Sequence, residues 1–336
     1  YVFFKFDGIS GQFSSVGPDA GDTGNENAEG IIRLEQYVRE ELREDIFFNT
    51  SVGTWASPFW YQITDATWRQ ENDHDRTGNN TIKRENWITY RDRLVYQNYV
   101  KNSPICPINT LMTHGFILTK YGPPASDERD YLPVRNELRA AFLYGSGMVE
   151  LYNDYDLMGS INGGTLWADL AECIAWQERN ADVLPDAHWV GGNPWTGSKA
   201  EVYGWAAWNG TKSTLALRNG ANDAQTFTFT LRQALNIPKN VNGSIILRSA
   251  FGIQDALEGL AEGTPINIDT ELTVKLPGSS IYGFEGIDAA ASIVPIQSIS
   301  IEEKDREENK VPVNQTMTLA ATITPADATF QALEWT

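Results

Sequence analysis

The sequence has 336 residues, 41% hydrophobic and 11% aromatic, which is long enough for two or three folded domains. Its formal net charge of −18 argues against a nucleic-acid-binding protein, because binding to phosphates needs a basic surface. No apolar run approaches the roughly 18 residues that a membrane-spanning helix requires. Eleven tryptophans is a high count, and although most of them should lie in the core, indole rings also form stacking surfaces for sugars.

Cysteine and histidine are scarce in the sequence. It contains only Cys106, Cys173, His74, His114 and His188. Their spacing matches no metal-binding motif, so we expect neither a metal site nor another cofactor. We expect the two cysteines to be buried thiols, and the sequence leaves open the alternative of a disulfide between them.

The chain opens with an apolar segment at positions 1–8, YVFFKFDG. Five of its first six residues are apolar or aromatic, which predicts a strand buried on both faces, as in a parallel sheet. The segment ends in Asp7 and Gly8, and glycine allows the backbone to turn sharply. Barrel enzymes keep catalytic groups at the carboxyl ends of such strands, so Asp7 is a candidate. The alternative is a solvated aspartate that precedes a turn.

Residues 10–27 are rich in Gly, Ser and Asp and predict a long loop. Between residues 31 and 42, apolar side chains recur at helical spacing and predict a helix. Residues 45–51 then read as a second short strand that ends in small polar residues. Strand, helix and strand in this order indicate a parallel sheet.

The same alternation continues as far as residue 179. We expect a helix at 84–101, a strand at 107–115, a helix at 132–144, a strand at 148–152 and a helix at 166–179. This order predicts an α/β fold, namely the second half of a (β/α)8 TIM barrel whose first half precedes this sequence. An open doubly wound sheet is the alternative, but the sequence lacks the glycine-rich phosphate-binding motif typical of it.

From about residue 200 the pattern changes to short alternating strands. They are expected at residues 201–208, 213–218, 226–231, 244–247 and 271–276. Asn209-Gly210 is a strong signal for a hairpin turn between the first two. These features predict an antiparallel β-sandwich domain of roughly ninety residues.

A hinge near residues 288–295 leads to a third module. The segments SISI at 298–301 and LAATITPADAT at 319–329, followed by Trp335, resemble about half of a bacterial Ig-like domain of group 2. Such modules decorate secreted and surface proteins of bacteria, so the resemblance implies a secreted, periplasmic or cell-surface location. The expected domains are residues 1–195 (half barrel), 196–288 (sandwich) and 293–336 (partial Ig-like domain).

Polar side chains mark three predicted strand ends: Lys5 with Asp7, Arg69 with Asp73, and His114. Two carboxylates that converge over a barrel suit glycoside hydrolysis, in which one attacks the anomeric carbon and the other protonates the leaving oxygen. Retaining enzymes hold them about 5–5.5 Å apart. Lys5 shares a strand face with Asp7, so it can bind a sugar hydroxyl and keep the carboxylate ionised. His114 is a candidate substrate contact.

Two segments resemble the signature motifs of glycoside hydrolase clan D, families 27 and 36. They are KFDG at positions 5–8 and WRQEND at positions 68–73. These families contain α-galactosidases and α-N-acetylgalactosaminidases, and in them a β-sandwich follows the barrel. The resemblance covers roughly residues 1–288, and the order of the two segments makes it more specific than either segment alone.

The resemblance also implies roles for individual residues. It implies that Asp7 is the nucleophile and Asp73 the general acid/base of a double-displacement reaction. It implies that Lys5 and Arg69 contact the sugar. The expected substrates are oligo- or polysaccharides with terminal α-galactosides or α-N-acetylgalactosaminides.

The segment at positions 49–55 departs from the family pattern. It lacks the Glu and Tyr that select galactose in the lysosomal relatives. Ser51 and Gly53 are small and would leave room for an N-acetyl group, and Trp55 is a candidate for stacking on the sugar. The sequence therefore leaves the identity of the sugar open.

Three other carboxylates compete with Asp73 for the acid role: Asp65, Glu71 and Asp75. Only the four-residue offset from Arg69 selects Asp73. Asp65 and Asp75 are expected to be solvated loop residues. His74 is expected to be an orienting or exposed residue, and Trp68 and Trp87 are expected in the core.

The favoured function is therefore a retaining α-galactosidase-like glycoside hydrolase. One alternative is a catalytically inactive carbohydrate-binding or adhesin-like surface protein, and another is a related barrel enzyme that acts on a different sugar. The presence of both Asp7 and Asp73 favours an enzyme, because a binding protein needs neither carboxylate. The sequence does not determine the oligomeric state.

Overall fold

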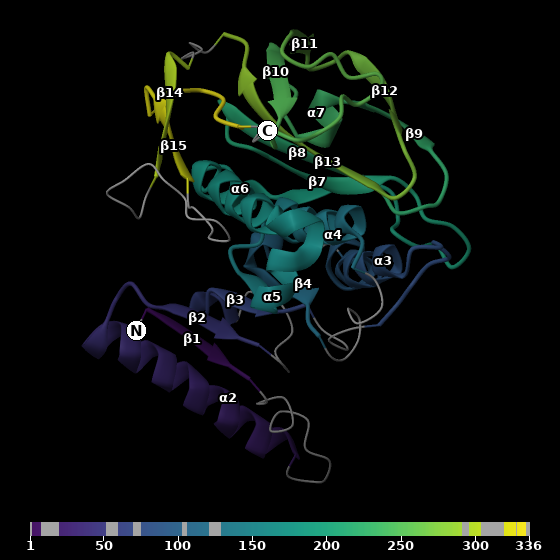
Figure 1. Ribbon diagram of the computed structural model, residues 1–336. Helices are drawn as coiled ribbons and strands as arrows, with labels where there is room; N and C mark the ends of the chain where they lie inside the picture. Colours follow the sequence, from purple (N-terminus) through teal and green to yellow (C-terminus); the bar gives the residue numbers. More distant parts are fainter. Residues whose placement is uncertain are drawn as a thin grey trace.

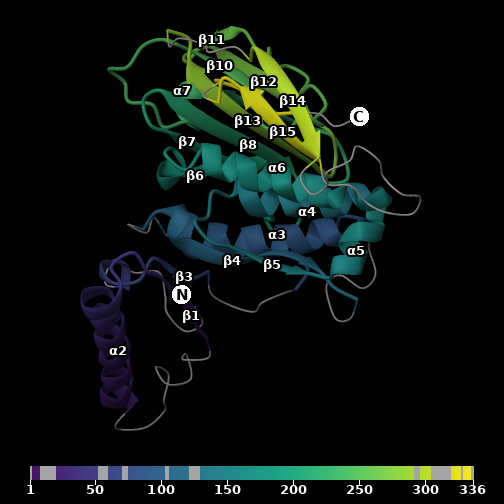
Figure 2. The same cartoon turned by 60° about the vertical axis from the view of Figure 1, so that its left-hand side comes forward.

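The computed structural model describes residues 2–7, 20–51, 60–69, 75–102, 106–120, 129–290, 296–303, 319–326 and 328–333, without the side chains of residues 20–25, 113 and 114. The first part of the chain alternates strands and helices, and the second part is built mainly from antiparallel strands (Figure 1). Figure 2 shows the layers in order: the antiparallel sheet, then helices α6, α4 and α3, then strands β4 and β5.

The first part contains a five-stranded parallel sheet with the strand order β1-β2-β3-β4-β5. The strands are β1 (Phe3–Phe6), β2 (Phe47–Thr50), β3 (Ala66–Trp68), β4 (Leu111–Leu118) and β5 (Val149–Asn153). The helices are α2 (Ala20–Tyr37), α3 (Lys83–Val95), α4 (Tyr131–Leu143), α5 (Tyr155–Ser160) and α6 (Leu166–Arg179). Each strand pairs with the next strand in the sequence, as the alternating pattern predicted.

The parallel sheet is strongly curved. Strands β1 and β5 are four positions apart, so in a flat sheet with a strand spacing of about 4.8 Å they would lie roughly 19 Å apart. A lysine and a glutamate side chain together are too short for that distance. Yet the Nζ atom of Lys5 on β1 lies 2.5 Å from Oε1 of Glu150 on β5. The two edge strands must therefore curve toward each other, with these side chains on the concave face.

Helices α3, α4 and α6 lie between the parallel strands and the antiparallel sheet (Figure 1, Figure 2). Their buried side chains form one core together with side chains from both sheets, among them Trp87, Leu138, Phe116 and Trp205. The helices pack closely on the antiparallel sheet at Gly283, where a Cβ atom would lie 2.8 Å from a terminal methyl group of Leu143 on α4 and would force it to shift.

The second part contains a six-stranded antiparallel sheet and a two-stranded antiparallel sheet. The larger sheet has the order β11 (Pro265–Asn267), β10 (Ser244–Ser249), β13 (Ser280–Asp288), β8 (Lys212–Asn219), β7 (Tyr203–Trp208) and β6 (His188–Gly191). The smaller sheet pairs β12 (Glu271–Leu276) with β9 (Gln225–Thr230), and the short helix α7 (Leu231–Ala234) follows β9. Residues from both sheets, including Leu217, Phe229, Val274 and Phe284, share a second core.

Two further strands, β14 (Ser298–Glu303) and β15 (Leu319–Thr324), pair antiparallel near the end of the chain. A cavity of about 350 Å³ separates this region from α6, with Ala171 and Ala175 on one side and Leu319 and Leu333 on the other. The Ig-like identity of the module stays a prediction, and so do the three domain boundaries.

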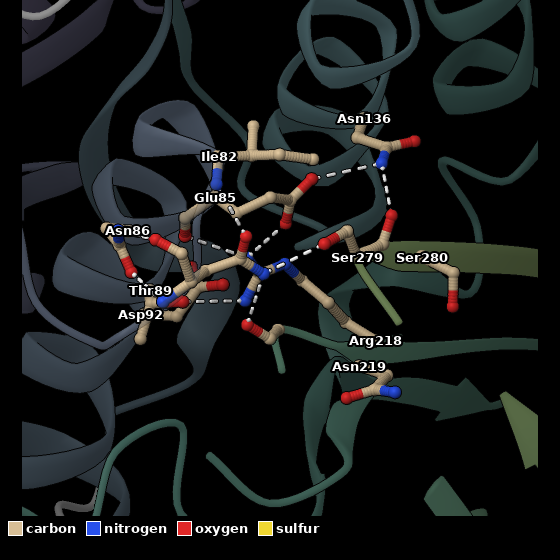
Figure 3. A network of polar contacts seen from close by, with 12 residues as sticks. Ile82, Glu85, Asn86, Thr89, Asp92, Asn136, Arg218, Asn219, Ser279 and Ser280 are labelled. Atoms are coloured by element: carbon tan, nitrogen blue, oxygen red, sulfur yellow. Dashed lines mark hydrogen bonds and ion pairs between the residues drawn. The ribbon is translucent and has the colours of Figure 1, made fainter. Parts of the chain in front are cut away.

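A network of buried charges joins α3 to the antiparallel sheet (Figure 3). The Arg218 guanidinium lies 2.7 Å from the Glu85 carboxylate, and each side chain is only 1% exposed. Arg218 also donates to the hydroxyls of Thr89 and Tyr203, and Tyr203 in turn donates to Asp92 at 2.5 Å. These contacts hold the antiparallel sheet against helix α3, which belongs to the first part of the chain.

Several predicted elements are confirmed, and α6 and β12 match the predicted bounds to the residue. Three predictions are wrong. Helix α2 begins at Ala20, within the predicted loop at 10–27, and β4 continues to Leu118, so residue 114 lies inside the strand and not at its end. Strand β1 is not buried on both faces: Phe3 and Phe4 are 43% and 41% exposed, because β1 is an edge strand among the described residues.

Candidate active site

The carboxyl edge of the parallel sheet gathers the residues that follow its first three strands. Asp7 follows β1, Ser51 follows β2 and Arg69 follows β3. Because the strands are parallel and paired in register, these positions belong to the same edge of the sheet. Three of the predicted site positions, Asp7, Ser51 and Arg69, are thus placed at one edge by the topology itself.

Lys5 stands at the centre of a polar cluster on the concave face. Its ammonium pairs with Glu150 at 2.5 Å, with the two side chains 21% and 10% exposed. Burial alone would lower the pKa of Lys5, but the hydrogen bond and charge of Glu150 outweigh it, and Tyr152 and Asp7 add to this effect, so the pKa is raised. Lys5 is therefore held in its charged form beside Asp7.

Tyr152 belongs to the same cluster as Lys5 and Glu150. It lies two residues after Glu150 on β5, so strand alternation puts both on one face. Burial raises the pKa of the Tyr152 hydroxyl, and the charge of Glu150 raises it further, whereas Lys5 lowers it. The phenol is accordingly a neutral hydrogen-bonding group next to the ion pair.

Ser51 is fully buried and is engaged by the neighbouring strand. Both its backbone N–H and its hydroxyl donate to the carbonyl oxygen of Phe6, each at 3.0 Å. This pair of bonds fastens the end of β2 to the end of β1, directly before Asp7. Ser51 therefore helps to position the Asp7 backbone, and its predicted contact with the sugar stays a prediction.

Arg69 is fully buried, with its guanidinium packed among aromatic rings. Its Cζ atom lies 4.5 Å from the ring centroid of Trp68 and 5.7 Å from that of Tyr90 on α3. Trp68 and Trp87 are buried, as predicted. These contacts hold the Arg69 side chain against α3, and its predicted contact with the sugar stays a prediction.

The competing carboxylates differ in their surroundings. Asp65 lies in the loop before β3, as predicted, but it is only partly solvated: 36% of its side chain is exposed, and it pairs with Arg39 at 2.5 Å and accepts the backbone N–H of Phe48 at 2.7 Å. It thereby joins the helical turn Val38–Leu42, which follows α2, to the sheet, which is a structural role. Asp75 is exposed and accepts the N–H of Arg76, in line with the expectation for a loop carboxylate.

Several predicted site residues lie outside the described part of the structure. These are Asp73, Gly53, Trp55, Glu71 and His74. The backbone of His114 belongs to β4, but its side chain is not described. The roles assigned to these residues from the sequence stay predictions.

Glu150 and Tyr152 are the site residues that the sequence analysis did not single out. The strand at 148–152 was predicted, but its charged residue was not interpreted. A carboxylate inside an otherwise apolar strand was the available signal, because such a group is rarely buried without a partner. Its partner, Lys5, is 145 residues away and could not be inferred from local spacing.

Both cysteines are free thiols, Cys173 buried and Cys106 partly buried. Burial raises the pKa of the Cys173 thiol far above its usual range. Among the residues that the structure describes, no helix is long and apolar enough to cross a membrane. The described side chains also include no group of three or more His, Cys, Asp or Glu residues placed to hold a metal ion.

No protein family model and no curated protein matches the sequence. Solved structures do resemble it. α-Galactosidase I from Mortierella vinacea is 14% identical, with a TM-score of 0.41 over 86% of this chain and 68% of that chain. α-Galactosidase from Saccharomyces cerevisiae is 9% identical, with a TM-score of 0.49 over 85% and 72%. A Bacillus halodurans protein described as an α-N-acetylgalactosaminidase is 11% identical, with a TM-score of 0.43 over 85% of this chain and 58% of that chain.

The chain thus spans between 58% and 72% of the length of these three proteins. α-Amylases are also among the similar structures. All of these are glycoside hydrolases, the class that the two sequence segments indicated. Because the three identities are 14% or lower and the TM-scores are below 0.5, the activity proposed below rests on the residues of this chain.

Proposed function

We propose that this chain carries both catalytic carboxylates, Asp7 and Asp73, of a retaining glycoside hydrolase that cleaves terminal α-galactosides or α-N-acetylgalactosaminides. In this proposal the curved parallel sheet is the second half of a (β/α)8 barrel, the antiparallel strands form a β-sandwich, and the last two strands belong to an Ig-like module. A secreted, periplasmic or cell-surface location in bacteria is part of the same proposal, because it follows from the Ig-like resemblance.

The observation that carries the proposal is the position of Lys5 and Asp7. Asp7 directly follows a parallel strand at the carboxyl edge, and Lys5 lies two residues earlier with its charge maintained. An ammonium beside a carboxylate favours the ionised, nucleophilic form of that carboxylate. The motif around Arg69 follows β3 at the same edge and would supply Asp73 as the second carboxylate.

The mechanism follows from two carboxylates with different tasks. Asp7 would attack the anomeric carbon and form a covalent glycosyl-enzyme while Asp73 donates a proton to the leaving oxygen. Asp73 would then take a proton from water, and the activated water would release the sugar with retained configuration. The small residues Ser51 and Gly53 are compatible with either a hydroxyl or an acetamido group at C2.

A panel of aryl α-glycosides tests the function and the sugar together. We expect turnover of the galactoside, the N-acetylgalactosaminide or both, with retention at the anomeric carbon. Asp7→Ala should abolish turnover while the fold persists, and added azide should restore part of the rate and yield a β-glycosyl azide. Binding of sugars without turnover would favour the carbohydrate-binding alternative, and turnover of a different glycoside alone would favour another sugar specificity.

A further inference from the structure

The ion pair between Lys5 and Glu150 joins the two edge strands of the described parallel sheet. The Nζ–Oε1 distance is 2.5 Å, and the two side chains are 79% and 90% shielded from solvent, since 21% and 10% of them is exposed. The partners are separated by 145 residues. The contact therefore depends on the curvature of the whole sheet and not on neighbouring sequence.

The charges around this pair are unbalanced. Strand alternation puts Asp7 on the face of Lys5 and Tyr152 on the face of Glu150. The single positive charge of Lys5 thus lies beside two carboxylates, Glu150 and Asp7, and the phenol of Tyr152 is neutral. Together these four side chains carry one net negative charge.

We propose that Glu150 is a positioning residue for Lys5 and a determinant of sugar specificity. By neutralising the ammonium, Glu150 makes the site accept neutral glycosides and reject sugars with a carboxylate, such as uronides. A lysine ammonium is a compact positive charge that would attract an anionic sugar. The Glu150 carboxylate neutralises this charge and repels the carboxylate of a uronide, because like charges brought together disfavour binding. The inference rests on the proposed function and adds a residue that neither sequence segment contains.

The first test compares neutral and anionic substrates. Glu150→Gln keeps the size of the side chain and removes its charge. We expect the ratio of kcat/KM for the aryl α-galactoside to that for the aryl α-galacturonide to fall by about tenfold, as expected for loss of one close charge interaction. Glu150→Asp, which keeps the charge, should retain most of the wild-type ratio.

A matched control is available in the antiparallel part of the chain. Glu258 pairs with Lys275 at 3.5 Å, and both side chains are largely exposed. Glu258→Gln makes the same chemical change far from Lys5 in the sequence and should leave the ratio unchanged. If Glu150→Gln leaves the ratio at the wild-type value as well, the proposed role of Glu150 is overturned.

A second readout does not need turnover. Calorimetric binding of galactose and galacturonate to the wild type and to Glu150→Gln should show the same shift toward the anionic sugar. A wild type that hydrolyses no α-glycoside but shows this shift would overturn the proposed function and support the role of Glu150. Hydrolysis of an α-glycoside without this shift in either assay would support the proposed function and overturn the role of Glu150.

The pairing itself is tested by a double-mutant cycle. Lys5→Met and Glu150→Gln should each lower the Tm, and the double variant should melt at a higher temperature than the sum of the two single shifts predicts. Additive shifts would show that the two side chains do not interact, which would also overturn the proposal.

Discussion

Two clusters of cations and carboxylates lie on opposite sides of the helix layer, and they differ in exposure. The pair Arg218–Glu85 is 1% exposed on both sides (Figure 3). Tyr203 bonds to Arg218 and extends this cluster to Asp92. The pair Lys5–Glu150 is 21% and 10% exposed and lies beside Asp7 at the edge of the parallel sheet. One cluster is fully enclosed by protein, and the other is partly exposed to solvent.

This difference indicates different tasks. A fully buried ion pair has already lost its solvent, so removal of one partner leaves an uncompensated charge in the interior. The pair Arg218–Glu85 therefore fixes helix α3 against strand β8. A partly exposed pair can still be reached by a ligand that hydrogen-bonds to it. The cluster around Lys5 has the composition and the exposure of a binding site.

The largest effect is expected from Asp73→Ala. Loss of a general acid should slow hydrolysis of a natural α-galactoside by about 10²–10⁴-fold. A dinitrophenyl glycoside should lose less in the glycosylation step, because its leaving group needs little protonation. The bell-shaped pH profile should lose its alkaline limb in this variant. Steady-state kinetics over a pH series on both substrates measures these effects.

Asp65→Ala and Asp75→Ala are the matched controls for Asp73→Ala. Both should retain the leaving-group sensitivity and the pH profile of the wild type. Asp65→Ala should lower the free energy of unfolding, because it leaves Arg39 and the Phe48 N–H without this carboxylate. If either control shows the kinetic pattern expected for Asp73→Ala, the assignment by offset from Arg69 is wrong.

The second-largest effect is expected from the buried cluster around Arg218 and Glu85. Arg218→Met should lower the free energy of unfolding by about 3–5 kcal/mol, because Glu85 loses its buried partner. Lys275→Met, which removes the exposed partner of Glu258, should change it by about 0–1 kcal/mol. Chemical denaturation measures both. Equal effects of the two substitutions would contradict the distinction between buried and open pairs.

A smaller effect is expected from Glu35 on α2, which is 1% exposed and bonded to the Thr50 hydroxyl at 2.8 Å. Burial raises the pKa of Glu35 from 4.5 to about 7, against the Thr50 hydrogen bond and the Arg39 charge, which lower it. Below pH 4.5 the carboxyl is neutral in both the folded and the unfolded chain. Between pH 4.5 and 7 only the unfolded chain ionises, so stability falls as pH rises and stays lower above pH 7.

Glu35→Gln should remove this dependence. Between pH 4.5 and 7 the free energy of unfolding should fall more in the wild type than in the variant, by up to about 3 kcal/mol. Solvent screening reduces this difference. Denaturation at a series of pH values checks the slope. A difference between the two proteins that does not change with pH would contradict the neutral state of Glu35.

The elements with regular apolar periodicity could be predicted from sequence, as α6 and β12 show. The strand β13 was missed because Gly283 and Gly286 interrupt its alternation; at Gly283 the strand packs closely against Leu143, which no local sequence pattern indicates. The burial of β1 was mispredicted because its composition indicates an apolar strand but not how many neighbours it has.

The site could be predicted only where the residues are close in sequence. Lys5 and Asp7 share a strand face by alternation, and the structure shows Asp7 close enough to raise the pKa of Lys5. Glu150 escaped prediction because its contact with Lys5 depends on the curvature of five strands. The same holds for Arg218, whose partners on α3 lie in a different part of the chain.

The most direct test of the proposed function is covalent trapping of the nucleophile. An activated fluorinated α-galactoside, or its N-acetylgalactosamine analogue, should inactivate the protein with a stoichiometry of one sugar per chain. Proteolysis and mass spectrometry should then find the sugar esterified to Asp7. A label on another carboxylate, or turnover in the Asp7→Ala variant at the wild-type rate, would contradict the account.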